Sequence, residues 1–159
     1  TISFGREDDT NALKFKNLLE EVNAIVKKNC VENSKTWLGK NYSEAEVDVL
    51  YNVNIKKYRD PDTGEETGKY PDTFRVKLPF YDNKFDCKIY DKSNVRNTLS
   101  DDDIKSKLSK GSKGKLLIQC NGVYFASGKF GISWKLVQAK ITPSKNMNEY
   151  AFMSSDDED

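Results

Sequence analysis

Two long segments near the end of the chain have the composition of β-strands and constrain the fold more than any other feature. They run from Lys115 to Ala126 and from Phe130 to Ile141, and both are rich in β-branched and aromatic residues. Both are also apolar on both faces, because residues 116–118 are Leu-Leu-Ile and residues 136–137 are Leu-Val. A strand has this pattern when one face meets a core and the other meets a helix or a ligand. We expect such surroundings for both strands.

Earlier in the chain, three segments have helical signals. Residues 10–29 follow the 3.6-residue period, with Thr10 or Asp9 able to cap the start. The predicted apolar face holds Leu18, Val22 and Ile25, with Leu19 and Val26. Ser43 and Glu46 have capping-box spacing, which predicts a short helix to about Tyr51. Ser100, followed by three aspartates, predicts another short helix, since acids stabilise the positive end of a helix.

Between these helices the period changes to two. The predicted strands are Ile55–Tyr58, Phe74–Phe80 and Phe85–Tyr90, with a tight hairpin turn at residues 81–84. About five strands with one to three short helices predict a mostly β, α+β chain. The five-stranded, partly open barrel of the OB-fold is the expected architecture, and an antiparallel sandwich is the alternative. We expect one domain over residues 1–148 and an acidic tail over residues 149–159.

The sequence contains no histidine, and this absence excludes several catalytic and metal-binding functions. Without His there is no Ser-His or Cys-His nucleophile pair, no imidazole base and no His-ligated metal. The cysteines, Cys30, Cys87 and Cys120, stand singly and form no zinc-knuckle spacing. We therefore expect a protein that is not an enzyme and that needs neither a cofactor nor a metal. Sparse cysteines and no apolar run near the roughly 20 residues of a membrane span predict an intracellular, reducing location.

Charge is distributed unevenly although the formal net charge is only +1. Residues 104–148 contain nine lysines and no Asp or Glu, whereas residues 149–159 contain five acids and no base. A basic segment of this length favours a polyanionic partner. The alternative is that the lysines only solvate exposed strands. The acidic tail could lie in a basic groove or dock basic patches on partner proteins, or it could be a solvated end.

Basic residues alternate with aromatic residues in the middle and last thirds of the chain. Lysine and arginine neutralise phosphates, and aromatic rings stack on unpaired bases for about 1–3 kcal/mol each. This combination favours a single strand over a duplex, whose bases are already stacked. The predicted binding residues are Lys56, Lys57, Tyr58, Arg59, Tyr70, Arg75, Lys77, Lys113, Lys115, Tyr124, Lys129, Phe130, Trp134 and Lys135.

The aromatic residues of this set differ in how well their positions fit stacking. Tyr58, Tyr70, Tyr124 and Phe130 lie among lysines, glycines or polar loop residues, which favours stacking on bases. Trp134 alternates with Ile132 and Leu136, so its pattern favours a core position over a stacking position, although it stays among the predicted binding residues. Phe125 shares a predicted face with Val123, which favours the core.

Two stretches carry a resemblance to a known family. The first is Lys57-Tyr58-Arg59-Asp60-Pro61-Asp62-Thr63-Gly64-Glu65 with the following Lys69-Tyr70-Pro71-Asp72-Thr73-Phe74-Arg75-Val76-Lys77-Leu78. The second is Ile118-Gln119-Cys120-Asn121-Gly122-Val123-Tyr124-Phe125 with the following Gly128-Lys129-Phe130-Gly131-Ile132-Ser133-Trp134-Lys135-Leu136. With the acidic end, they resemble the phage-type single-stranded DNA-binding proteins of large nucleocytoplasmic DNA viruses.

This resemblance implies an OB-fold barrel that coats and protects single-stranded DNA during viral replication, recombination and repair. It also implies a possible homodimer at replication sites in the host cytoplasm or nucleus. Tail contacts with replication proteins would involve Asp156, Asp157, Glu158 and Asp159. Phage members end in an aromatic residue, whereas this sequence ends at Asp159 with Phe152 upstream, so we expect the tail contacts to differ.

Two other functions fit the sequence. One is a protein-interaction or virion-structural β-barrel module in which the tail is the active element. The other is an RNA-binding protein, since the same surface accepts either sugar. Salt dependence separates nucleic-acid binding from the first alternative, because log K falls by about 0.7 for each single-strand phosphate neutralised. Competition between RNA and DNA addresses the second.

Overall fold

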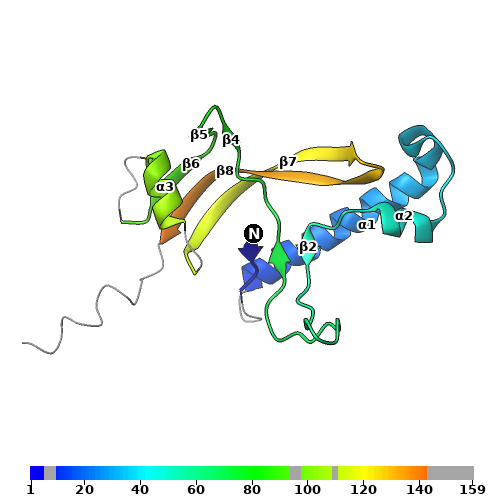
Figure 1. The fold of residues 1–159 in the computed structure, drawn as a ribbon, viewed down its shortest axis with the longest axis horizontal. Helices are drawn as coiled ribbons and strands as arrows, with labels where there is room; N and C mark the ends of the chain where they lie inside the picture. Colours follow the sequence, from blue (N-terminus) through cyan, green and yellow to red (C-terminus); the bar gives the residue numbers. More distant parts are fainter. Residues whose placement is uncertain (6–9, 94–97, 109–110, 143–159) are drawn as a thin grey trace, which may run out of the picture. The chain divides into compact units, whose positions relative to one another are not determined.

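The computed structural model describes residues 1–5, 10–93, 98–108 and 111–142. The helices are α1 (Thr10–Leu38), α2 (Glu44–Leu50) and α3 (Asp101–Lys107). The strands are β1 (Ile2–Ser3), β2 (Ile55–Lys56), β3 (Thr73–Phe74), β4 (Phe80–Tyr81), β5 (Lys84–Phe85), β6 (Lys88–Asp91), β7 (Lys113–Ala126) and β8 (Lys129–Thr142) (Figure 1). Helices and strands occur together along the chain, which confirms the α+β class.

The strands form three separate sheets rather than one. Their orders are β1-β3-β2, β4-β5 and β6-β8-β7. In the first sheet, Phe74 pairs with both Ile2 and Ile55, and both pairings are antiparallel. In the third sheet, β6 pairs parallel to β8, with Ile89 opposite Ala139. No closed barrel is present in the described part of the chain, so the five-stranded barrel is not confirmed.

The chain divides into two compact units, and each contains part of the long β7–β8 pair. The first unit comprises Thr1–Lys77 and Gln119–Lys135, and the second comprises Leu78–Ile118 and Leu136–Asp159. Among the described residues, no helix combines the length and apolar character needed to cross a membrane.

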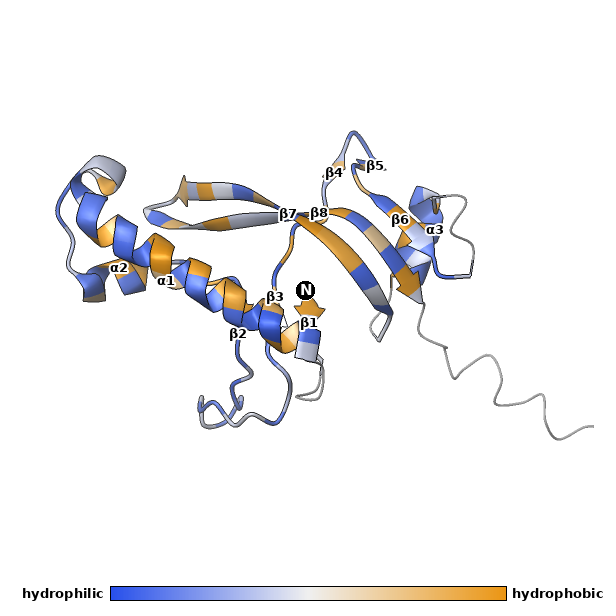
Figure 2. Ribbon diagram, turned by 180° about the vertical axis from the view of Figure 1, so that it is seen from behind, coloured by the Kyte–Doolittle hydropathy of each residue, from blue (hydrophilic) through white to orange (hydrophobic). Residues whose placement is uncertain are grey.

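Helix α1 is longer than predicted, and its buried face matches the predicted one only in part. It continues past residue 29 to Leu38, with non-helical dihedral angles at Asn33, and Gly39 follows with a φ of +86°. Its buried residues are Leu19, Asn23, Cys30 and Ser34, whereas Leu18 and Ile25 are exposed. The predicted face is therefore correct at Leu19, Val22 and Val26, which are buried or half-buried, and wrong at Leu18 and Ile25. Polar Asn23 and Ser34 occupy further core positions that a hydropathy pattern does not detect. Figure 2 shows hydrophobic and hydrophilic residues alternating along this helix.

The core of the first unit has an aliphatic-aromatic part and an aromatic part. One buried cluster contains Cys30 on α1, Val47 on α2, Tyr51 at the end of α2, and Phe130 on β8. The ring of Phe74 contacts the rings of Phe4, Phe15 and Trp134, with centroid distances of 5.8 to 6.1 Å. These contacts join β8 to the N-terminal helix and to the first sheet.

Short-range signals in the sequence predicted local structure well. The capping box at α2 is present: Glu46 N donates to Ser43 Oγ, and Ser43 N donates to Glu46 Oε2 at 2.8 Å. The predicted hairpin turn joins β4 to β5, with Asp82 and Asn83 at φ values of 49° and 61°. Two consecutive residues with positive φ match the right-handed twist of a two-residue hairpin.

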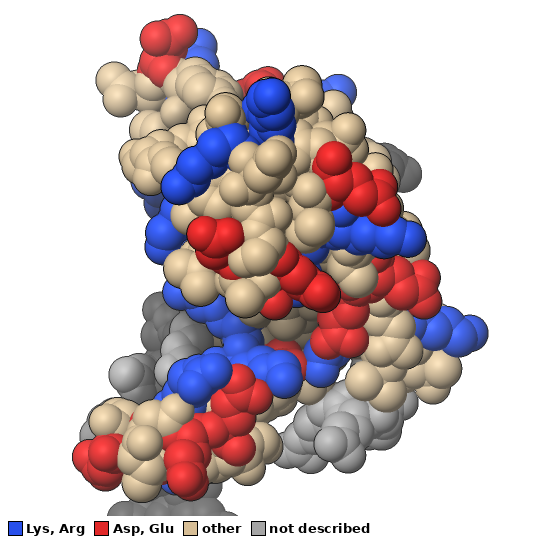
Figure 3. Space-filling model, turned by 90° about the vertical axis from the view of Figure 1, so that its right-hand side faces the viewer, with Lys and Arg blue, Asp and Glu red and all other residues tan. Residues whose placement is uncertain are grey.

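Charges of opposite sign lie side by side on the face that Figure 3 shows. Among the ion pairs of the first unit, Lys16 Nζ lies 2.7 Å from Asp72 Oδ2, and Lys27 Nζ lies 2.8 Å from Asp48 Oδ1. Both pairs tie α1 to later segments of the first unit. The formal number of lysines therefore overestimates the charge available to a partner.

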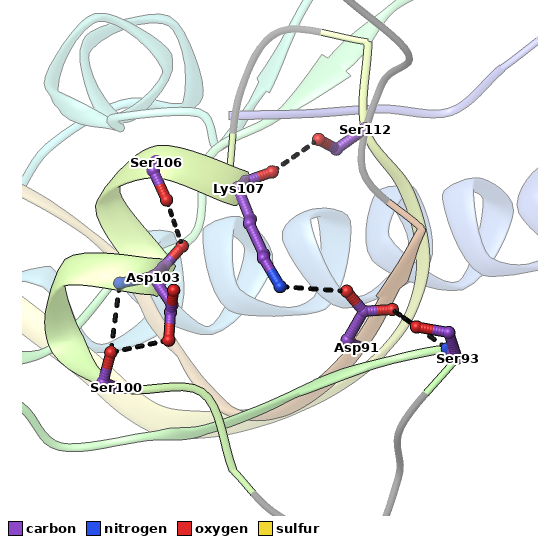
Figure 4. Close-up of polar contacts among 7 residues, drawn as sticks. All are labelled: Asp91, Ser93, Ser100, Asp103, Ser106, Lys107 and Ser112. Carbon is purple, nitrogen blue, oxygen red and sulfur yellow. Dashed lines mark hydrogen bonds and ion pairs between the residues drawn. The ribbon is translucent and has the colours of Figure 1, made fainter.

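In the second unit, a polar network connects α3 to the strands around it (Figure 4). Ser100 caps α3 by accepting from Asp103 N at 3.2 Å, as its sequence predicted. Lys107 Nζ, near the other end of this helix, donates to Asp91 Oδ2 at 3.3 Å. The core beneath is formed by the buried side chains Ile89, Ile104, Leu136, Ala139 and Ile141.

Candidate nucleic-acid interface

The predicted binding residues are divided between the two units. Lys113 and Lys115 belong to the second unit, and all the others belong to the first. Both lysines are exposed on β7. Lys115, Tyr90 and Lys140 line a shallow hollow of about 520 Å³ in the second unit.

In the first unit, a groove of about 690 Å³ runs along one side of α1. Three of the predicted binding residues line it, namely Lys56, Lys57 and Arg59. Apolar Val53 and Ile55 also line it. The groove therefore combines cations with the kind of apolar surface against which a base could lie.

A buried polar pair also lines this groove. The Tyr51 hydroxyl donates to Asn23 Oδ1, and both side chains are at least nine-tenths buried. Burial raises the pKa of Tyr51 above its usual value, and the neighbouring Tyr124 and Cys120 contribute in the same direction. Tyr51 therefore keeps its proton and stays a donor.

The carboxylate of Glu66 bridges two of the predicted cations. Its Oε1 lies 2.7 Å from Arg59 Nη2, and its Oε2 lies 3.1 Å from Lys57 Nζ. Arg59 Nη1 also donates to the carbonyl of Gly64 at 3.3 Å. The pattern of basic residues did not reveal this pairing, because Glu66 lies in a loop whose acids have no regular spacing.

Tyr58 and Tyr70 lie at the two sides of the same polar loop and contact each other. Their ring centroids are 4.7 Å apart in an edge-to-face arrangement. Tyr70 is 53% exposed, and Lys69 Nζ lies 5.7 Å from its ring centroid. Tyr70 is thus the more accessible ring of the pair, and Tyr58 supports it from one side.

A second group of predicted residues meets where the segment after β3 runs beside β8. We call Arg75, Lys77, Tyr124 and Lys135 the hairpin cluster. Lys77 and Lys135 form a parallel bridge, and Lys77 N donates to the Trp134 carbonyl at 2.8 Å. Lys77 Nζ lies 5.9 Å from the centroid of the Tyr124 ring. Within the described residues, neither Arg75 nor Lys77 forms an ion pair with an acid.

The Tyr124 ring is fixed in this cluster by contacts that the sequence did not predict. Asn52 Nδ2 donates to the Tyr124 hydroxyl at 2.8 Å. Gly131 provides the space: a Cβ built there would lie 2.8 Å from the Asn52 carbonyl oxygen and 3.1 Å from the Tyr124 hydroxyl oxygen. Only glycine allows the two backbones to approach this closely.

Phe130, predicted to stack on bases, is instead a core residue. Its side chain is fully buried, with its ring centroid 5.1 Å from that of Tyr51. The neighbouring glycine and lysine suggested exposure, but Lys129 points outward and Phe130 inward, as alternation along a strand requires. Trp134 is half-buried against Phe74, which favours its core alternative.

Phe125 differs from its prediction in the opposite direction. It was expected in the core, but 49% of its surface is exposed. Its ring lies nearly parallel to that of Phe130 at 6.1 Å and edge-to-face with Trp37 at 6.0 Å. One face of Phe125 is thus supported by the core while the residue remains accessible to a partner.

Lys129 and the four acids of the tail are the predicted binding residues that remain. Lys129 is exposed at the start of β8, next to the turn with β7. Asp156, Asp157, Glu158 and Asp159 lie outside the described residues.

Within the described ranges, no group of three or more Cys, Asp or Glu side chains is arranged to hold a metal ion. Cys30, Cys87 and Cys120 are free thiols, and burial raises the pKa of the first two.

Comparison with known families gives one match, which covers residues 6–154. The chain belongs to this family, DUF5871, a family of unknown function. Comparisons with curated proteins and with solved structures gave no match.

Proposed function

We propose that this member of the DUF5871 family binds single-stranded DNA, largely without sequence preference and without catalysis, through its first unit. The observation that carries this proposal is the hairpin cluster. Three residues that were predicted from the sequence to bind nucleic acid, Lys77, Tyr124 and Lys135, come together there from distant parts of the chain, with Arg75 two residues before Lys77. The five-stranded OB-fold barrel that the resemblance implies is not required for this surface to bind a strand.

The hairpin cluster has the two elements that single-strand binding needs. Lys77 and Arg75 are exposed and supply positive charge for phosphates. Tyr124 supplies a ring whose hydroxyl is fixed by Asn52, so little side-chain freedom would be lost when a base stacks on it. Phe125 and Tyr70 are further accessible rings in the same unit.

Stacking and phosphate contacts together favour a flexible single strand. A base must be unstacked before an aromatic side chain can cover its face, and duplex bases are already covered by their neighbours. The phosphate contacts also require that affinity fall with salt, by about 0.7 in log K for each phosphate neutralised. A protein-interaction module would not show this dependence on an oligonucleotide.

The test is fluorescence anisotropy of a labelled mixed-sequence single strand at low and high salt, with the matching duplex and an RNA of the same sequence as competitors. We expect salt-sensitive binding that strongly prefers the DNA single strand over the duplex. Failure to bind at low salt would contradict the proposal and favour the protein-interaction alternative. Equal or better competition by RNA would favour the RNA-binding alternative.

Roles in viral replication, recombination and repair, contacts of the acidic tail with replication proteins, and dimer formation belong to the same proposal. They rest on the resemblance of residues 57–78 and 118–136 to the viral family. A tail-deletion variant lacking residues 149–159 tests the tail separately. It should keep its affinity for DNA and lose only its protein partners.

A further inference from the structure

The strongest unexplained feature of the groove is that its cations are already occupied by an anion of the same chain. Lys57 and Arg59 are exposed, at 55% and 65% of their side-chain surface, and both contact Glu66. The two carboxylate oxygens are divided between them, one at 3.1 Å from lysine and the other at 2.7 Å from arginine. An anion with two oxygens therefore fits between these two cations.

A phosphodiester presents the same chemistry as this carboxylate. It carries one negative charge on two non-bridging oxygens, and guanidinium and ammonium groups bind it with the same geometry. The Lys57 and Arg59 donors that hold Glu66 would hold a backbone phosphate. The carboxylate thus stands where a phosphate would bind.

The loop that carries Glu66 is organised without its carboxylate. Asp60 N donates to the Glu65 carbonyl at 2.9 Å, and Gly64 N donates to the Asp60 carbonyl at 2.8 Å. Asp60 Oδ1 accepts from Asp62 N and Thr63 N at 2.9 and 3.2 Å. The Glu66 side chain is 39% exposed, so it can rotate into solvent while these bonds persist.

We propose that Lys57 and Arg59 form a phosphate-binding site that Glu66 occupies in the free protein and that a DNA phosphate takes over on binding. Glu66 weakens binding, since its two ion pairs must break before the phosphate can enter. It also reduces the attraction of the loop for other anions. This inference rests on the proposed function and assigns a specific site and a built-in competitor to it.

The neighbouring Glu65 provides a matched control. It lies in the same loop, its side chain is exposed and it forms no ion pair within the described residues. E66Q and E65Q remove the same charge from positions one residue apart. A purely long-range effect of net charge would change the affinity equally in both variants.

The experiment measures single-strand affinity at low salt for wild type, E66Q, E65Q, R59Q, E66Q/R59Q, K57Q/R59Q and K57Q/R59Q/E66Q. We expect E66Q to bind about three- to tenfold more tightly than wild type, given the strength of exposed ion pairs, and E65Q to change affinity less than about twofold. The gain should shrink with R59Q, where only the Lys57 pair remains, and disappear with K57Q/R59Q, so that the triple variant binds no more tightly than K57Q/R59Q alone. Circular dichroism confirms that all variants fold.

The outcomes separate this inference from the proposed function. Binding by wild type with equal effects of E66Q and E65Q overturns the inference and leaves the proposed function intact. A gain in E66Q that persists in the K57Q/R59Q background also overturns it, because the relieved cation would then be neither Lys57 nor Arg59. Absence of binding by every variant overturns the proposed function, and the inference with it.

Discussion

The groove along α1 and the hairpin cluster contain similar residues but make them available to different degrees. In the groove, Lys57 and Arg59 both form ion pairs with the single carboxylate of Glu66. In the hairpin cluster, Lys77 contacts an aromatic ring and forms no ion pair with an acid within the described residues. A cation that faces a ring keeps its charge for a partner, whereas a cation in an ion pair must first be released. Lys57 and Arg59 therefore differ from Lys77 in that they are already paired with an acid of the same chain.

The largest expected effect is on stability and comes from Phe130, whose ring contacts the rings of Tyr51 and Phe125. We expect Phe130→Ala to lower the free energy of unfolding by about 3–5 kcal/mol, as for other buried aromatic residues. Urea denaturation measures this, with the half-exposed Phe125→Ala as a control that should cost less. If Phe130→Ala reduced DNA affinity while stability stayed near wild type, the original stacking prediction would be restored.

Removal of the ring in the hairpin cluster should affect binding more than stability. We expect Tyr124→Ala to cost about 1–3 kcal/mol of single-strand affinity if the ring stacks on a base. Tyr124→Phe keeps the ring and removes only the hydroxyl that Asn52 contacts, so it should retain most of the affinity. Anisotropy titrations of both variants measure the difference. Equal losses in the two variants would show that the hydroxyl, and not the ring, contacts DNA.

A direct comparison of two lysines tests the difference in available charge. Lys77→Ala should weaken binding about three- to tenfold, and Lys57→Ala less than about threefold, because Lys57 gives up an ion pair in order to bind. Lys28→Ala, on the exposed surface of α1 and outside the groove, is the control for net charge. A larger effect of Lys57→Ala than of Lys77→Ala would reverse the proposed ranking of the two surfaces.

Tyr51 belongs to the buried cluster and also lines the groove. Its ionisation should have the smallest effect on the free energy of unfolding at neutral pH. The pKa of Tyr51 is raised in the folded chain above the usual value of about 10. Its contribution to stability is thus complete below pH 10 and is lost as pH rises through the folded-state pKa. Urea midpoints at pH 7 and pH 11 should differ more for wild type than for Tyr51→Phe. An equal difference would show that Tyr51 ionises alike in the folded and unfolded chain.

Sequence patterns predicted structure where the determining contacts are local. The capping box at Ser43, the cap at Ser100 and the turn at Asp82-Asn83 each depend on atoms within a few residues, so their residue types are sufficient evidence. The boundaries of β7 and β8 were also close to those predicted, because apolar and polar residues change at both ends.

Long-range pairing and burial could not be predicted in the same way. The parallel pairing of β6 with β8 and the division of strands among three sheets depend on contacts between residues far apart in the chain. Phe130 was expected to be accessible and is buried, whereas Phe125 was expected in the core and is half-exposed. A ring beside glycine and lysine can point to either side of a strand, so these residue types did not decide between the two sides. Glu66 and Asn52 were missed because a side chain that positions a cation or a ring has no signature of its own.

The close approach at Gly131 has a consequence for sequence variation. Even a methyl group there would meet the Asn52 carbonyl at 2.8 Å, so backbone rather than a flexible side chain would have to move. Members of this family that keep the hairpin cluster should therefore all have glycine at this position. A member with a larger residue there would need a different connection after α2, and its equivalent of Tyr124 would lose the Asn52 contact. This single position thus offers a way to sort the family into members that retain the proposed interface and members that do not.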